Sequence, residues 1–152
     1  MQIGTVIYEE CNGDIIIPFK NEAIGLKGIW AMYGKENEAS DYKCLNVGKC
    51  KNIGEEIIYD LGCMHYIEYR EDGTEKYINQ FNEECEFSYK QGQPIEYLYP
   101  YLTLKYPIFK FIYVCQENDR KKEKEYATKN HALFWRNGRP WRSKTKNLLS
   151  LN

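Results

Sequence analysis

Side chains able to contact phosphate or transfer protons are concentrated in the last quarter of this chain of 152 residues. Residues 116–152 carry ten Lys and Arg side chains against four acids, so this segment has a net charge of +6 while the whole chain has −1. His131 lies within the segment and is the better candidate of the two histidines for phosphate contact or proton transfer. This asymmetry is typical of an acidic body with a basic, phosphate-binding patch. The alternative is a solvated basic tail without a ligand.

Tryptophans interleave with arginines in the same segment. Guanidinium groups pair with phosphate and aromatic rings stack on bases, so this combination favours contact with nucleic acid. The candidate nucleic-acid-binding residues are Arg136, Arg139, Trp141 and Arg142.

Soft metal ligands form a weaker constellation. Cys44, Cys50, Cys63 and His65 together provide the donor types of a zinc site if strand and helix meet. Structural zinc sites usually show tighter paired spacing, so we interpret the cysteines as small core residues and expect no zinc. We expect the thiols to be reduced, since the start of the chain lacks the basic and apolar regions of a secretory signal.

Composition indicates a soluble, cytoplasmic protein with no membrane partner. Apolar residues make up 43% and charged residues 28%, and no apolar run approaches the roughly 18 residues of a membrane span. Aromatic residues reach 15%, which suits half-buried sheet faces and base stacking. The abundance of Lys, Asn, Ile, Tyr and Glu resembles the product of an AT-rich genome, bacterial or phage.

The first half of the chain predicts strands followed by a helix. An Asn-Gly turn between two β-branched runs predicts a hairpin within residues 1–25, and further strands are expected at 27–33 and 42–47. Asn52 as N-cap, Glu55 three residues later and apolar residues at helical spacing predict a helix over 52–66.

The second half predicts another hairpin, an irregular insertion, a buried strand and a charged helix. The hairpin turns at 72–73, and the insertion covers about 80–107 because prolines interrupt it. The nearly continuous apolar run 108–115 predicts a central strand. A helix is expected from 120 to about 135, ended by Asn137-Gly138, followed by a disordered tail over 143–152. The fold class is therefore α+β, with a small antiparallel central sheet flanked by helices in one domain, 1–152.

Two glycine-centred segments carry a resemblance to a known family. Gly28-Ile29-Trp30 ends in an aromatic residue, and Asn46-Val47-Gly48 is followed by Lys49 and the helix start at Asn52. With a late strand and helix in the right order, this pattern resembles the GIY-YIG nucleases over roughly residues 26–141. The resemblance implies a three-stranded antiparallel sheet flanked by helices, decorated here by the N-terminal hairpin.

The resemblance assigns candidate catalytic residues by position. Trp30 and Asn46 stand where the family has its two tyrosines, Glu56 stands at the arginine position, and Lys49 lies beside the second glycine. An indole only donates a hydrogen bond and a carboxamide has no useful pKa, so neither can act as a general base. The first turn of a helix also favours a glutamate at position 56 for structural reasons.

The family's metal-binding glutamate corresponds to Glu123 or Glu125, and the metal would be Mg²⁺ or Mn²⁺. Either acid can equally be a surface ion-pair partner of a nearby lysine. In the family fold Trp30 and Asn46 lie on neighbouring antiparallel strands that face the helix bearing these acids.

We expect a GIY-YIG-like protein with impaired catalysis, which binds nucleic acid or a nucleic-acid-processing protein. One alternative is an active metal-dependent endonuclease with a rearranged site. Another is a small phage or mobile-element protein that binds and inhibits a host defence nuclease. In a third alternative the chain is an unrelated α+β domain, and its glycine segments are coincidental turns. The oligomeric state stays open.

Overall fold

The computed structural model describes residues 1–64, 75–78, 84–89, 99–135 and 142–143. Its main element is a six-stranded sheet with the order β2-β1-β7-β3-β4-β8. Neighbouring strands are antiparallel except β8, which pairs in parallel with β4 at one edge. The strands are β1 (Val6–Cys11), β2 (Asp14–Ile17), β3 (Gly28–Lys35), β4 (Lys43–Cys50), β7 (Ile108–Cys115) and β8 (Phe134–Trp135).

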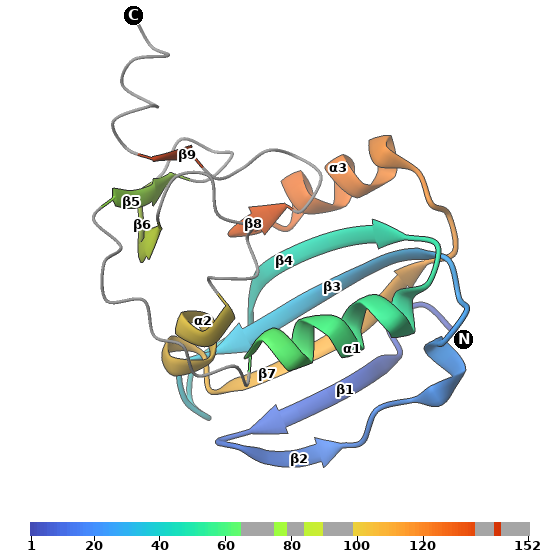
Figure 1. Ribbon diagram of the computed structural model, residues 1–152, viewed down its shortest axis with the longest axis horizontal. Coiled ribbons are helices and arrows are strands. Elements are labelled where there is room, and N and C mark those ends of the chain that lie inside the picture. The colour runs from blue at the N-terminus through green and yellow to red at the C-terminus, as the bar shows by residue number, and fades with distance from the viewer. Residues whose placement is uncertain (65–74, 79–83, 90–98, 136–141, 144–152) are drawn as a thin grey trace, which may run out of the picture.

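Helices lie on both sides of this sheet (Figure 1). The side carrying α1 (Ile53–Met64) and α2 (Tyr99–Lys105) is called the α1 side, and the opposite side, where α3 (Arg120–Lys129) packs against β4, is called the α3 side. A short 3-10 helix, η1 (Asn21–Ala23), joins β2 to β3. A second sheet has the order β6-β5-β9 and comprises β5 (Glu75–Ile78), β6 (Glu84–Tyr89) and β9 (Arg142–Ser143). No helix among the described residues is long and apolar enough to span a membrane.

Local sequence explains the position of α1. The Asn52 side-chain oxygen accepts hydrogen bonds from the backbone N–H of Glu55 (3.1 Å) and of Gly25 (2.7 Å), so it caps the helix and ties it to the chain before β3. A Cβ at Gly54 would lie 2.6 Å from the backbone nitrogen of Ile24. The first turn can therefore pack this closely against η1 and Ile24 only with glycine at position 54.

The core has two parts, one on each side of the sheet. Large side chains fill the α1 side, where Trp30, Phe109 and Phe111 are fully buried. Smaller side chains fill the α3 side, where Val47 packs with Ala127 of α3. The heavier apolar burial is thus on the α1 side, which contributes more of the hydrophobic stabilisation.

The α+β class and the antiparallel central sheet are confirmed, as are the N-terminal hairpin, the strands expected at 27–33, 42–47 and 108–115, and the helix after Asn52. The hairpin does not decorate a three-stranded core, however. It joins the same sheet, because β1 pairs with β7.

Two other expectations are wrong. The region 80–107 is not irregular throughout, because it contains β6 and α2. The charged helix ends at Lys129 and not near residue 135, since His131 has a φ of +50° and the next residues form β8. The turn at 72–73, the helix stop at 137–138 and residues 144–152 of the expected tail lie outside the described residues.

Candidate functional site

Trp30 and its two neighbouring glycines are explained by packing. A Cβ at Gly48 would lie 2.5 Å from Cζ2 of the Trp30 indole, and Trp30 is the Cα partner of Gly48 across the β3–β4 pair. Gly28 has a φ of +144°, and a Cβ there would lie 1.9 Å from the carbonyl oxygen of Cys115. The indole is fully buried, and its Nε1–H donates to Oε2 of Glu56 at 2.7 Å. This arrangement stabilises the fold and leaves the indole inaccessible to a ligand.

Asn46 belongs to a buried hydrogen-bond chain. Its Nδ2 donates to the Tyr99 hydroxyl at 2.7 Å, and that hydroxyl donates to Oδ2 of Asp60 at 3.0 Å. Asn46, Tyr99 and Asp60 are all fully buried. Among the described residues, the buried Asn46 Oδ1 atom has no hydrogen-bond partner. The chain of hydrogen bonds joins β4, α2 and α1 and so helps to fix how these elements pack.

The expected strand placement is confirmed, but the expected facing is wrong. Trp30 and Asn46 lie on neighbouring antiparallel strands, yet their hydrogen bonds reach α1 and α2. The helix with Glu123 and Glu125 packs on the opposite side of the sheet. Trp30 and Asn46 share this side through ordinary alternation, because Trp30 pairs with Gly48 and Met32 pairs with Asn46, and the β-bulge comes only after these pairs.

The remaining predicted residues do not converge on one cleft. Glu56 lies on the α1 side with Trp30, whereas the Lys49 ammonium lies 3.4 Å from Oδ1 of Asn118, just before α3. Glu123 is fully buried and Glu125 is exposed, as expected for two residues about 200° apart around a helix. His131 is exposed beyond the end of α3.

Metal ligands do not cluster in the part of the chain that the structure describes, where no group of three or more His, Cys, Asp or Glu side chains could hold an ion. Cys44 lies on the α3 side, whereas Cys50 and Cys63 pack against the α1-side core. Burial raises the pKa of the Cys44 thiol to about 12, although a hydrogen bond from Tyr33 opposes this shift. The raised pKa disfavours the thiolate that zinc requires. His65 falls outside the described residues.

The predicted nucleic-acid-binding residues 136, 139 and 141 also lie outside the described residues. Arg142 lies in β9, and its Cα partner is Ile78 of β5.

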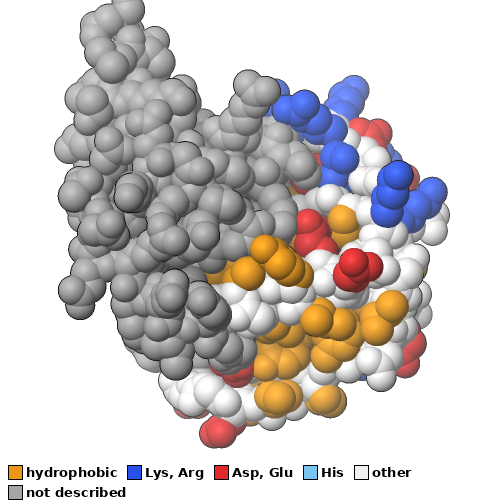
Figure 2. All heavy atoms as spheres, in the orientation of Figure 1, with side chains coloured by type: hydrophobic (Ala, Val, Ile, Leu, Met, Phe, Trp, Pro, Cys, Tyr) orange, Lys and Arg blue, Asp and Glu red, His pale blue; other side chains and the backbone are white. Residues whose placement is uncertain are grey.

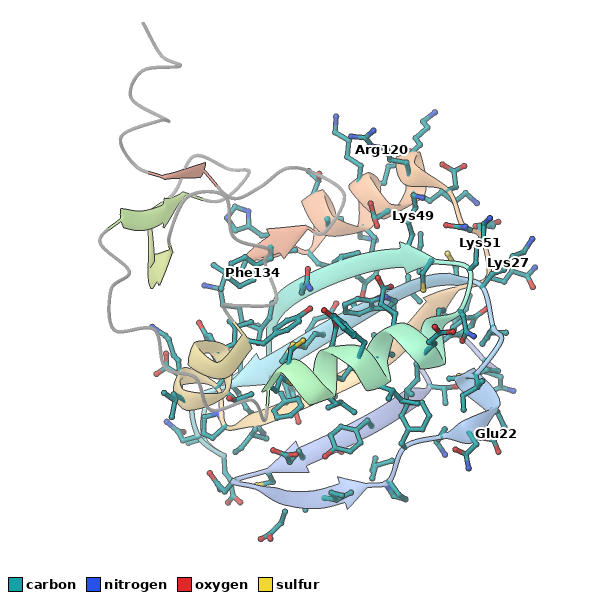
Figure 3. The ribbon with its side chains drawn as sticks, viewed as in Figure 1. Glu22, Lys27, Lys49, Lys51, Arg120 and Phe134 are labelled. Carbon is teal, nitrogen blue, oxygen red and sulfur yellow. The ribbon has the colours of Figure 1, made fainter. Side chains whose placement is uncertain are left out.

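A different group of basic side chains does converge, at the end of the sheet where β3 begins and β4 ends (Figure 3). Lys27 directly precedes β3, and the pairing of Gly28 with Cys50 brings the end of β4 beside it. Arg120 begins α3, and the Lys49 contact with Asn118 places the loop before this helix against the same end. We call this group the basic end. It consists of Lys27, Lys49, Lys51 and Arg120.

Nearby acids are already engaged within the fold. The Asp119 carboxylate caps α3 by accepting a hydrogen bond from the Lys121 backbone N–H at 2.7 Å, and Glu117 pairs with Lys122. Lys27 and Lys51 are exposed and form no ion pair with any described residue. Within the basic end, Lys27 and Lys51 therefore present to solvent positive charge that no carboxylate of the described residues pairs.

Figure 2 shows how the described surface is divided. Lys and Arg side chains gather over α3 and the neighbouring strand ends, whereas apolar side chains gather over α1 and the β1–β2 hairpin. Of the basic end, only Lys49 is among the site residues expected from the sequence. Lysines at the start of one expected strand and the end of the next were a usable signal, because antiparallel pairing brings those positions together.

No protein-family model, no curated protein and no solved structure matches this chain.

Proposed function

We propose that the protein binds nucleic acid through the basic end and does not cut it. The observation that carries the proposal is the convergence of lysine and arginine side chains from three separate segments on one end of the sheet. Ammonium and guanidinium groups displace the counterions of a phosphate backbone, and this release favours binding. The overall charge of −1 does not oppose it, since the local field at the patch governs the encounter.

The buried state of Trp30 and Asn46 supports binding over catalysis. The GIY-YIG resemblance places these residues at the catalytic tyrosines, but both are fully buried and hydrogen-bonded to the α1-side helices. A scissile phosphate has no access to such groups. Membership of that family, a role for Mg²⁺ or Mn²⁺, and inhibition of a host defence nuclease stay predictions.

The binding proposal is tested by charge reversal. Fluorescence anisotropy with labelled single-stranded DNA, duplex DNA and RNA is measured at about 50 and 200 mM salt. Lys49→Glu/Lys51→Glu is expected to lower the affinity about tenfold or more. The matched control is Lys43→Glu/Lys105→Glu. Lys43 lies at the opposite end of β4 from the basic end, and its Cα partner Gly34 faces Tyr106 on the α1 side. Absence of binding at low salt, or equal affinity of the two variants, would overturn the proposal.

The absence of cutting is tested separately. Purified protein at high concentration is incubated with plasmid DNA and with RNA in the presence of Mg²⁺ or Mn²⁺. We expect both substrates to stay intact. Cleavage that persists through purification and is lost in Glu123→Gln or Glu125→Gln would instead establish the alternative of an active endonuclease.

A further inference from the structure

The α3 side of the sheet is only partly covered. α3 packs against β4, near one edge, and leaves Ile112 and Val114 of β7 half-buried on the same side. Tyr33 of β3 is also half-buried there, and its hydroxyl is hydrogen-bonded to that of Tyr126 in α3. An apolar and aromatic strip therefore runs along the strands beside the helix.

A second basic cluster lies at the far end of this strip, around Tyr42. The Lys110 ammonium is 4.0 Å and the Lys35 ammonium 4.7 Å from the centroid of the Tyr42 ring. The Tyr42 hydroxyl donates to Oε1 of Glu9 at 2.9 Å. Neither lysine forms an ion pair with a described residue, so the four side chains carry a net charge of +1. Two half-buried cations thus converge on one ring beside Glu9, which is the Cα partner of Lys110 in β1.

The two basic groups are separated along the strands. Lys49 is the Cα partner of Ile29, and Lys35 lies six residues further along β3. At about 3.3 Å per residue this separation is roughly 20 Å. Lys49 and Lys110 both extend from the α3 side, since Lys49 contacts the loop before α3 and Lys110 is the Cα partner of Tyr33. Cations therefore lie at both ends of the strip, and the half-buried side chains of Tyr33, Ile112 and Val114 lie between them along the strands.

We propose that single-stranded nucleic acid lies along this strip, with its phosphates at the basic end and at Lys35 and Lys110 and its bases against Tyr33, Ile112 and Val114. This inference rests on the proposed function and adds the class of nucleic acid and its path. Charge complementarity selects a polyanion, and an open sheet surface with apolar and aromatic side chains suits unpaired bases, whose faces are free to stack. Duplex DNA keeps its base faces inside the helix, so it gains nothing from the apolar strip and is expected to bind at the basic end alone.

The experiment compares a labelled oligothymidine of about 12 nucleotides with a duplex of equal length. Wild-type protein is expected to bind the single strand at least about tenfold more tightly. Lys35→Glu/Lys110→Glu should lose about tenfold in affinity for the single strand and little for the duplex. Lys43→Glu/Lys105→Glu again serves as the control with the same change of charge. Lys35→Gln/Lys110→Gln provides a second variant, and circular dichroism verifies that each variant is folded.

The outcomes separate this inference from the proposed function. The path is wrong if the duplex binds as tightly as the single strand and the Lys35/Lys110 variants bind like the control. If Lys49→Glu/Lys51→Glu still loses affinity in that case, the basic end binds nucleic acid without the path. If neither nucleic acid binds wild-type protein, both proposals fail. A photo-crosslink from a halogenated uridine oligonucleotide to Tyr33 or Tyr42 would place the strand directly. Crosslinks confined to the α1 side would overturn the path.

Discussion

The two sides of the central sheet differ in how far the side chains of the same strands, β3 and β4, are buried. On the α1 side, β3 and β4 contribute Trp30, Asn46 and Gly48, which are fully packed and hydrogen-bonded to the helices. On the α3 side, β4 contributes Lys49, which is half-buried at the end of the strand and contacts Asn118. The comparison shows that residues whose spacing resembles a catalytic motif can be buried in the core. A neighbouring residue of the same strand, Lys49, lies nearer the surface, where we propose that a ligand binds.

The largest loss of stability is expected at the Trp30–Gly48 pair. Trp30→Ala should lower the free energy of unfolding by about 3–5 kcal/mol, because it empties a fully buried site. Gly48→Ala should cost about 1–3 kcal/mol, because the new methyl group would overlap the indole. Urea unfolding followed by circular dichroism measures both.

A double-mutant cycle sharpens this comparison. In a Trp30→Leu background the overlap at position 48 is relieved, so Gly48→Ala should cost much less there than in the wild-type protein. A cost of Gly48→Ala that is the same in both backgrounds would show that the glycine is required by its backbone and not by the indole.

The buried hydrogen-bond chain should have the next largest effect. Tyr99→Phe removes the acceptor for Asn46 Nδ2 and the donor to Asp60, and we expect a loss of about 1–3 kcal/mol in the free energy of unfolding. Tyr59→Phe is the matched control, because Tyr59 lies on the same helix as Asp60 and is 59% exposed. Equal unfolding midpoints for the two variants would show that the chain contributes no stability.

Alkaline pH should lower the free energy of unfolding through Cys44, which is buried on the α3 side. Burial raises the pKa of its thiol from 9.0 to about 12. Between these values the unfolded chain releases the thiol proton and the folded protein keeps it, so stability falls as pH rises from about 9 to about 12. Cys44→Ala should make this decline shallower in urea titrations. A slope unaffected by Cys44→Ala would contradict the assignment.

Elements with a strong local signal could be predicted from the sequence. The apolar run that became β7 and the Asn52 cap of α1 appear where they were expected. The three prolines between 80 and 107 predict breaks, but Pro100 stands in the first turn of α2, where proline is favourable. The early end of α3 depends on the left-handed backbone of His131, which no local rule requires of a histidine.

The candidate site was harder to predict, because it depends on which side of the sheet each residue faces. The bulge opposite Met32 and Tyr33 adds one residue to β4 and places Cys44 on the same side as Val47, and the sequence around it carries no clear signal. The charge asymmetry predicts phosphate binding by residues 116–152, and this stays a prediction. The basic end, however, includes Lys27 and Lys51, which flank β3 and β4 far from that segment, and only the pairing of these strands brings the two lysines together.

The smallest effect on stability is expected at the basic end, where Lys27 and Lys51 are exposed and the free energy of unfolding should change by no more than about 0.5 kcal/mol on substitution. This is also where binding should change most. The most direct test is the salt dependence of single-strand affinity for wild-type protein and for Lys27→Glu/Lys49→Glu/Lys51→Glu. Loss of three phosphate contacts should reduce the slope of log affinity against log salt concentration by about two. Equal affinities and slopes for the two proteins would contradict the account.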